Sequence, residues 1–205
     1  MKVRESGMPG EKQWESFFEP EYILKTIGLD SNSVNVAEFG CGYGTFTIPA
    51  SKTVKGTVYA FDIEQEMINR VIERAHNENL NNIQTMLRDF VNQGSGLENE
   101  SVDYVMLFNI IHAENPEELL KETYRILGPN GKLGIIHWNF DPGTPRGPPM
   151  NIRPKPEQCI EWAVKAGFNF ENKHNLKPYH YGLVFSKIAR FKTQDQEFLI
   201  KNRIK

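Results

Sequence analysis

The chain has 205 residues, of which 39% are hydrophobic, and a formal net charge of −2 at pH 7. This length and apolar content predict one domain with a well-buried core, and the charge gives no electrostatic reason to expect nucleic acid. Cys41 and Cys159 form neither a metal-binding spacing nor a disulfide framework, which favours no metal site and a reducing, cytoplasmic location. We expect neither a signal peptide nor a membrane-spanning segment, because no apolar run is long enough.

The two ends of the chain have distinct patterns. Apolar residues including Trp14, Phe17 and Ile23 recur at steps of three and four, which predicts an amphipathic leading helix over residues 11–28. Residues 189–205 carry five basic and two acidic side chains, typical of a solvated polar tail.

A strand followed by a glycine-rich turn is the most informative motif. The apolar strand that contains Glu38 runs into three glycines at alternate positions: Gly40, Gly42 and Gly44. Glycines in such a turn allow unusual backbone angles and let the main chain approach a ligand closely. The dinucleotide fingerprint needs its third glycine one residue later, at Thr45, so the spacing disfavours a nicotinamide or flavin cofactor. A tight connection in some other α/β protein is the alternative.

Acidic residues follow the next two predicted strands. The strand over residues 56–61 ends at Asp62, about twenty residues past the middle glycine, where a carboxylate can meet ribose hydroxyls. Asp62 also fits the N-cap of the helix that opens at residues 63–67, and both roles can coexist. Residues 82–87 form the third predicted strand, and Asp89 lies just beyond its end.

The remaining chain alternates strands and helices, which predicts a mostly parallel sheet wrapped by helices. Residues 67–75 carry an apolar stripe that includes Ile72, and residues 102–109 read as a strand buried on both faces. A helix between Pro116 and Gly128 precedes the strand 132–138, and a helix over 156–167 precedes strands at 168–176 and 179–188. The loop 139–154, dense in proline and glycine, fits a binding loop and a surface crossover equally well.

Taken in order, these segments resemble the class I methyltransferases that use S-adenosylmethionine, over nearly the whole chain. Segments 101–105, 111–112, 116–127 and 129–133 are similar to the small-molecule branch that also holds quinone-biosynthetic and sterol enzymes. Asn130 and His137 depart from that pattern, because glycine and an acidic residue are common at those positions. The resemblance implies one Rossmann-like domain over residues 1–205, a three-layer sandwich with a seven-stranded, mostly parallel sheet and an extra N-terminal helix.

The resemblance also implies a site for S-adenosylmethionine, whose product is S-adenosylhomocysteine. Glu38 would contact the amino group of the cofactor, Asp62 the ribose hydroxyls, and Asp89 with the Phe90 backbone the adenine edge. The full implied set is Glu38, Gly40, Cys41, Gly42, Gly44, Asp62, Ile63, Asp89, Phe90 and Asn109.

Acceptor and base residues are less constrained by the sequence. Trp14, Phe17 and Tyr43 are candidates for an acceptor pocket, and packing in the core is their alternative role. His112 and His137 follow or end strands at the ligand edge and are weak candidates for a general base, with structural hydrogen bonding as the alternative.

The expected activity is methyl transfer to a small-molecule acceptor by a monomer or homodimer without metal, nucleic acid or membrane. The alternatives are methylation of RNA or protein, for which the basic tail is the only indication, and a cofactor-binding partner subunit without catalysis. The sequence does not identify the acceptor, because specificity depends on loops and pocket shape.

Overall fold

A computed structural model describes residues 8–187 of the chain. It contains a single sheet of seven strands: β1 (Val36–Phe39), β2 (Val58–Asp62), β3 (Ile83–Leu87), β4 (Val102–Phe108), β5 (Leu127–Trp138), β6 (Phe168–Leu176) and β7 (His180–Lys187). The spatial order is β3-β2-β1-β4-β5-β7-β6. The strands from β3 to β5 pair in parallel, and β7 runs antiparallel to both β5 and β6. The predicted seven-stranded, mostly parallel sheet is confirmed.

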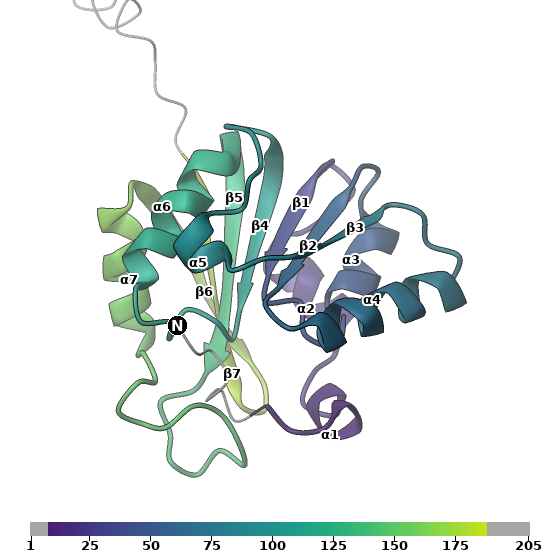
Figure 1. The fold of residues 1–205 in the computed structure, drawn as a ribbon. Helices are drawn as coiled ribbons and strands as arrows, with labels where there is room; N and C mark the ends of the chain where they lie inside the picture. The colour runs from purple at the N-terminus through teal and green to yellow at the C-terminus, as the bar shows by residue number, and fades with distance from the viewer. Residues whose placement is uncertain (1–7, 188–205) are drawn as a thin grey trace, which may run out of the picture.

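Helices cover both faces of this sheet, which gives the expected three layers (Figure 1). The helices are α1 (Glu11–Glu15), α2 (Pro20–Thr26), α3 (Thr47–Thr53), α4 (Gln65–Asn77), α5 (Phe90–Gln93), α6 (Pro116–Ile126) and α7 (Pro156–Lys165). Figure 1 shows α5, α6 and α7 on one side of the sheet and α2, α3 and α4 on the other.

The central strand β4 shows how the sequence produces the two cores. Successive side chains of a strand point to opposite faces. Val105 and Leu107 pack with the buried residues of α6 and α7, whereas Tyr104 and Met106 pack with those of α2 and α3. All four side chains have no exposed area, so an uninterrupted apolar run is required, as expected for a strand covered on both faces.

The leading helix differs from the prediction, because residues 11–28 form two short helices instead of one. Pro20 is the first residue of α2, and its ring and missing N–H group prevent a continuous helix from passing through it. Tyr22 of α2 is 62% exposed, whereas Phe17, Phe18 and Ile23 are in the core.

Three smaller predictions are corrected as well. β5 begins at Leu127 and not at residue 132, because Leu127 already pairs with Val102 of β4. The pairing register then shifts around the turn that contains Asn130, whose φ is 63°. Ile72 of α4 is 51% exposed, at the border of the stripe whose other members are buried. α7 ends at Lys165 and β7 is described from His180 to Lys187. The predicted polar tail, residues 189–205, lies outside the described residues.

The proline- and glycine-rich loop after β5 is held together from within. The guanidinium of Arg153, which is 7% exposed, donates hydrogen bonds to the carbonyl oxygens of residues 139, 141, 146 and 148 and to the Thr144 hydroxyl. This arrangement favours a packed crossover. Among residues 8–187, no helix is both long and apolar enough to cross a membrane.

Candidate functional site

A cavity of about 590 Å³ lies where β1, β2 and β4 end. The carboxyl ends of parallel strands are the ligand-binding edge of an open α/β sheet. The cavity is lined by the turn after β1, the end of β2, the start of α4, and the residues at the ends of β4 and β5, with Trp14 of α1 closing one side. Its size is within the range of pockets that enclose small ligands.

The turn after β1 has a shape that only glycine permits at its first position. Gly40 has a φ of 77°, and a Cβ atom there would lie 2.6 Å from the Cδ1 atom of Ile110. The N–H groups of Gly40 and Cys41 both donate to the carbonyl oxygen of Phe61, which ties the turn to β2. Gly40, Cys41, Gly42 and Tyr43 of this turn all line the cavity.

Asp62 joins the end of β2 to this turn. Its carboxylate accepts the N–H of Gly42 at 2.9 Å and the N–H of Glu64 at 3.0 Å, and the residue is 8% exposed. Burial raises the pKa of Asp62, although the backbone N–H groups act in the opposite direction. Helix α4 starts at Gln65 with Glu64 in the N-cap position, so the alternative that Asp62 caps this helix is wrong.

Glu38 is buried beneath the same turn and is 2% exposed. Its Oε2 atom accepts a hydrogen bond from the Thr47 hydroxyl at 2.5 Å. Burial raises the pKa of Glu38 to about 8, and the nearby charge of Asp62 adds to this effect. A carboxyl group in this position would lose its proton more readily beside a cation.

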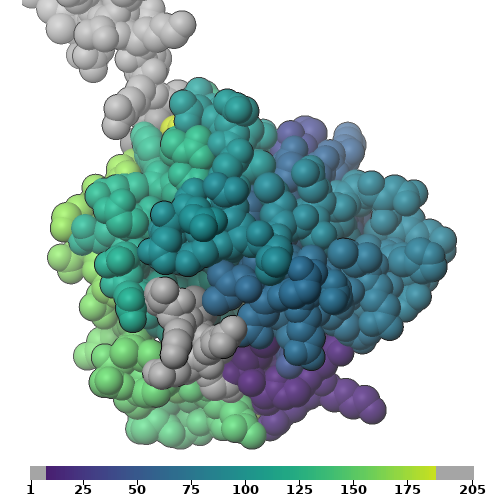
Figure 2. All heavy atoms as spheres, in the orientation of Figure 1, coloured from purple at the N-terminus to yellow at the C-terminus, as the bar shows by residue number. Residues whose placement is uncertain are grey.

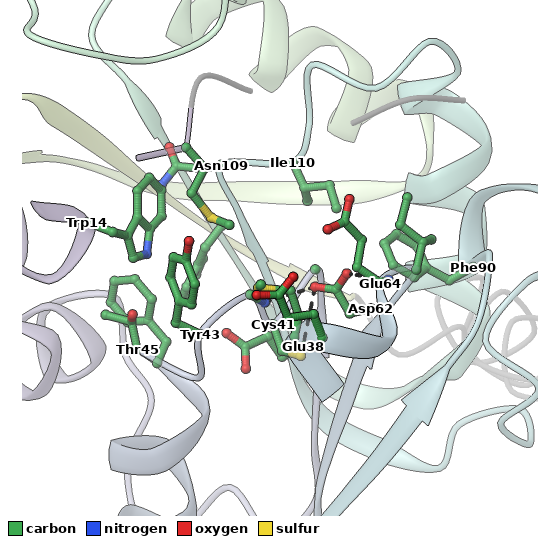
Figure 3. A pocket seen from close by; sticks show the side chains of 18 of the residues that line it. Trp14, Glu38, Cys41, Tyr43, Thr45, Asp62, Glu64, Phe90, Asn109 and Ile110 are labelled. Atoms are coloured by element: carbon green, nitrogen blue, oxygen red, sulfur yellow. Dashed lines mark hydrogen bonds between the residues drawn. The ribbon is translucent and has the colours of Figure 1, made fainter. Parts of the chain in front are cut away.

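The acidic side chains of Asp62 and Glu64 lie towards one end of the cavity. Asp62, Glu64 and Phe90 lie on one side of the close-up view, whereas Trp14, Thr45 and Asn109 lie on the other, with Glu38 and Cys41 between them (Figure 3). Within the described part of the chain, the lining holds four acidic residues and no lysine, arginine or histidine. Such a site suits a ligand with a positive charge at the acidic end and a neutral group at the other.

Most of the predicted cofactor residues come together here. The lining includes Glu38, Gly40, Cys41, Gly42, Asp62, Ile63, Phe90 and Asn109, and also the acceptor candidates Trp14 and Tyr43. The combination of a glycine turn, a buried carboxyl group and a carboxylate at the end of β2 fits S-adenosylmethionine, which carries an ammonium group and ribose hydroxyls. The individual roles of these residues remain predictions.

Three of the predicted cofactor and acceptor residues lie outside the lining. The Asp89 carboxylate caps α5, where it accepts hydrogen bonds from the backbone and side-chain N–H groups of Asn92, and these bonds lower its pKa. Phe17 packs against Trp138 and Tyr179, with ring centroids 5.3 and 5.8 Å away. Gly44 faces Val71 of α4, which leaves it a structural role in the turn.

The two histidines proposed as bases contact each other instead of the cavity. His112 Nδ1 lies 3.1 Å from His137 Nε2, and neither residue belongs to the lining. Burial lowers the pKa of His112 to about 4 and holds that of His137 well below its usual range. The His180 ring packs between Phe18 and Trp138 in tilted contacts. Structural hydrogen bonding is the role that these positions favour for His112 and His137.

Several lining residues were missed by the sequence analysis. Thr45 and Phe46 extend the glycine turn, and Phe108 ends β4 just before Asn109. Adjacency to a predicted site residue was the available signal for each of them. Glu66 and Met67 belong to the first turn of α4 and follow Asp62 closely, so the same signal applied there.

Comparison with known proteins gives consistent findings. A family model described as a methyltransferase domain matches residues 36–131. An uncharacterized methyltransferase-like protein of Schizosaccharomyces pombe is 32% identical over 119 residues, covering 58% of this chain and 43% of that protein. A demethylmenaquinone methyltransferase of Lactobacillus johnsonii is 32% identical over 103 residues, covering 47% of this chain and 40% of that protein. The chain thus spans less than half the length of these two curated relatives.

The fold is also that of a solved structure. The crystal structure of a SAM-dependent methyltransferase from Aquifex aeolicus matches with a TM-score of 0.79 and 24% sequence identity. The match covers 92% of this chain and 100% of that one. This likeness shows that the two chains share one fold.

Proposed function

Since residues 36–131 belong to the methyltransferase domain family and the sheet has the class I fold, we propose that this protein methylates a small organic acceptor. The domain is of the S-adenosylmethionine-dependent type. The observation that carries the proposal is the division of the cavity into an acidic end beside the glycine turn and an uncharged aromatic end.

The residues at the acidic end would hold the cofactor. Glu38 would pair with the ammonium group, Asp62 would accept hydrogen bonds from the ribose hydroxyls, and Ile63 and Phe90 would pack against the adenine. Asp62 is already fixed by the N–H groups of Gly42 and Glu64, so its carboxylate needs little rearrangement to bind. Fixed groups of this kind add affinity because less freedom is lost on binding.

S-adenosylmethionine supplies a methyl group that a positively charged sulfur has already activated. The protein then has to align the acceptor with that methyl group and exclude water. Trp14, Phe46, Phe108 and Trp138 provide an apolar wall for this purpose. His112 and His137 are not assigned as a general base, because neither residue lines the cavity.

A small acceptor is favoured over protein by the cavity's volume of about 590 Å³. It is favoured over RNA by the acidic residues around the cavity, which would repel a phosphate backbone. The similarity to a demethylmenaquinone methyltransferase is consistent with a small acceptor, although the match covers only part of each protein. A non-catalytic partner subunit would bind the cofactor without turnover. Cytoplasmic location, a single domain, and a monomeric or homodimeric state remain predictions.

Isothermal titration with S-adenosylmethionine, S-adenosylhomocysteine and NADH tests the cofactor part of the proposal. We expect micromolar binding of the first two compounds and none of NADH. Binding of NADH alone would contradict the proposal and indicate an oxidoreductase. A search for methyl transfer from labelled cofactor to small-molecule extracts, with total RNA and protein as parallel acceptors, tests the other part.

A further inference from the structure

We propose that the aromatic end of the cavity binds an uncharged ring compound through the Asn109 carboxamide and the Thr45 hydroxyl. This inference rests on the proposed function, because it describes the acceptor that the cavity would place beside the cofactor. The ligand class is a planar ring that carries a hydrogen-bond donor and an acceptor side by side, as in an amide or in a hydroxyl next to a carbonyl.

The Asn109 side chain is buried in the cavity wall without a partner. The residue is 7% exposed, and neither Oδ1 nor Nδ2 forms a hydrogen bond within the described structure. Its backbone is fixed, because the N–H group donates to the Ile136 carbonyl oxygen at 2.7 Å. A buried polar group without a hydrogen bond costs about 1–3 kcal/mol, and such groups are rare in folded proteins. A ligand that pairs with both atoms of the carboxamide would remove this cost.

Thr45 is a second lining residue with a buried polar atom that has no partner in the described structure. This atom is the hydroxyl oxygen Oγ1, and the residue is 4% exposed. Thr45 lies in the turn before α3 and Asn109 directly follows β4, yet both line the cavity and lie on the same side of Figure 3 as Trp14. Two unpaired groups from separate segments indicate a site for a polar ligand.

The surrounding charges define what that ligand carries. Trp14, Phe46, Phe108 and Trp138 supply flat apolar surfaces, which favour a ring. The described lining has no cationic side chain, and its four acidic residues disfavour a ligand with a net negative charge. A cation would compete with the cofactor for those carboxyl groups. An uncharged ligand avoids both conflicts.

A backbone role is the alternative explanation for Asn109. Its φ is 56°, a left-handed conformation that asparagine tolerates better than most residues. Glycine adopts this conformation even more readily. Asn109→Gly therefore keeps the backbone and removes only the carboxamide, which separates the two explanations. Asn79, which is exposed at the end of α4 and also has a φ of 56°, provides the matched control Asn79→Gly.

The probes are benzamide, benzoate and benzylamine, three single-ring compounds that carry a neutral, a negative and a positive group. Binding is measured by ligand-observed NMR, with and without saturating S-adenosylhomocysteine, on the full chain. We expect benzamide to bind more tightly than benzoate and benzylamine. Asn109→Gly should weaken benzamide binding about tenfold, since two hydrogen bonds are lost. Thr45→Val should weaken it a few-fold, whereas Thr45→Ser and Asn79→Gly should leave it unchanged.

Preferential binding of benzoate or benzylamine would overturn the inference, as would equal benzamide binding by Asn109→Gly and the natural chain. Circular dichroism and the unfolding midpoint show whether each variant is folded. A protein that binds S-adenosylhomocysteine but not benzamide would refute this inference and leave the proposed function intact. A protein that binds benzamide through Asn109 but not S-adenosylhomocysteine would support the uncharged site and refute the proposed function.

Discussion

The two ends of the cavity are built in different ways. The acidic end consists of consecutive backbone and side-chain groups at the ends of neighbouring strands, and hydrogen bonds already connect Gly42, Asp62 and Glu64. The aromatic end is assembled from α1, the turn before α3, and the ends of β4 and β5. Two of its polar side chains, Thr45 and Asn109, have no hydrogen-bond partner in the described structure. The difference between the two ends indicates that the acidic end is preformed to bind the cofactor. The aromatic end, in contrast, is completed when a second ligand, the acceptor, binds.

The largest expected effect comes from filling the glycine turn at the acidic end. Gly40→Ala would place a Cβ atom 2.6 Å from Ile110 Cδ1, in a backbone conformation with positive φ. The strain and the clash together should lower the free energy of unfolding by about 2–5 kcal/mol, measured by urea denaturation. Gly10→Ala is the control, because no atom lies within 4 Å of its added Cβ. Equal stability of both variants would show that the turn is not as tightly packed as described.

Removing the charge at the end of β2 should affect the cofactor and leave the fold largely intact. Asp62→Asn should weaken S-adenosylhomocysteine binding at least about tenfold, since hydrogen bonds to a charged group contribute roughly 1.5–3 kcal/mol. Titration calorimetry provides the measurement. Asp103→Asn is a close control, because Asp103 also accepts two backbone N–H groups, from Val34 and Asn35, but does not line the cavity. Unchanged affinity in Asp62→Asn would reduce Asp62 to a structural role.

The pH dependence of the free energy of unfolding should reveal the protonation of Glu38. Its pKa is about 8 in the folded protein, against 4.5 for an ordinary glutamate. The folded state therefore holds a proton that the unfolded state has lost between these two values. The resulting stabilisation is complete below pH 4.5 and is lost as the pH rises through 8, at about 1.4 kcal/mol per pH unit.

Glu38→Gln should remove this dependence. Unfolding free energies at pH 6, 7 and 8 without cofactor should diverge between the natural chain and the variant by about 1.4 kcal/mol per pH unit. Glu21→Gln on the exposed face of α2 is the control. Parallel pH profiles of the unfolding free energy for all three proteins would mean that Glu38 is ionised in the empty site. The two ends of the cavity would then differ in shape and not in charge state.

Proton release from Glu38 on ligand binding also distinguishes the two ends of the cavity. If an ammonium group pairs with the ionised Glu38, cofactor binding near pH 7 should release up to one proton from this residue. Calorimetry in buffers of different ionisation enthalpy measures that release. Benzamide, which is expected to bind at the aromatic end, should bind without proton release. Proton release on binding of both ligands would argue against two separate ends.

The sequence predicted the acidic end well because local patterns determine it. Alternating apolar residues located the strands, and the glycine spacing with Glu38 and Asp62 located the turn and the end of β2. The aromatic end was harder to predict, because Trp14 and Phe17 belong to the same apolar pattern, yet only Trp14 reaches the cavity. That choice depends on how α1 is oriented, and four residues separate the end of α1 at Glu15 from the start of α2 at Pro20.

Asp89 shows a second limit of the same kind. Its position after β3 matched the resembled family, but the short helix α5 directs its carboxylate to Asn92. A four-residue helix leaves too weak a periodic pattern to be recognised in a sequence. The histidines were placed correctly near the ends of β4 and β5, and their mutual contact could not be foreseen without the parallel pairing of those strands.

A crystal structure of the protein with S-adenosylhomocysteine would test the division of the cavity most directly. The account predicts the amino group of the ligand against Glu38 and the ribose against Asp62, with the side chains of Thr45 and Asn109 free of contact with it. A ligand that lies across Trp14, Thr45 and Asn109 and leaves Asp62 uncontacted would contradict the account.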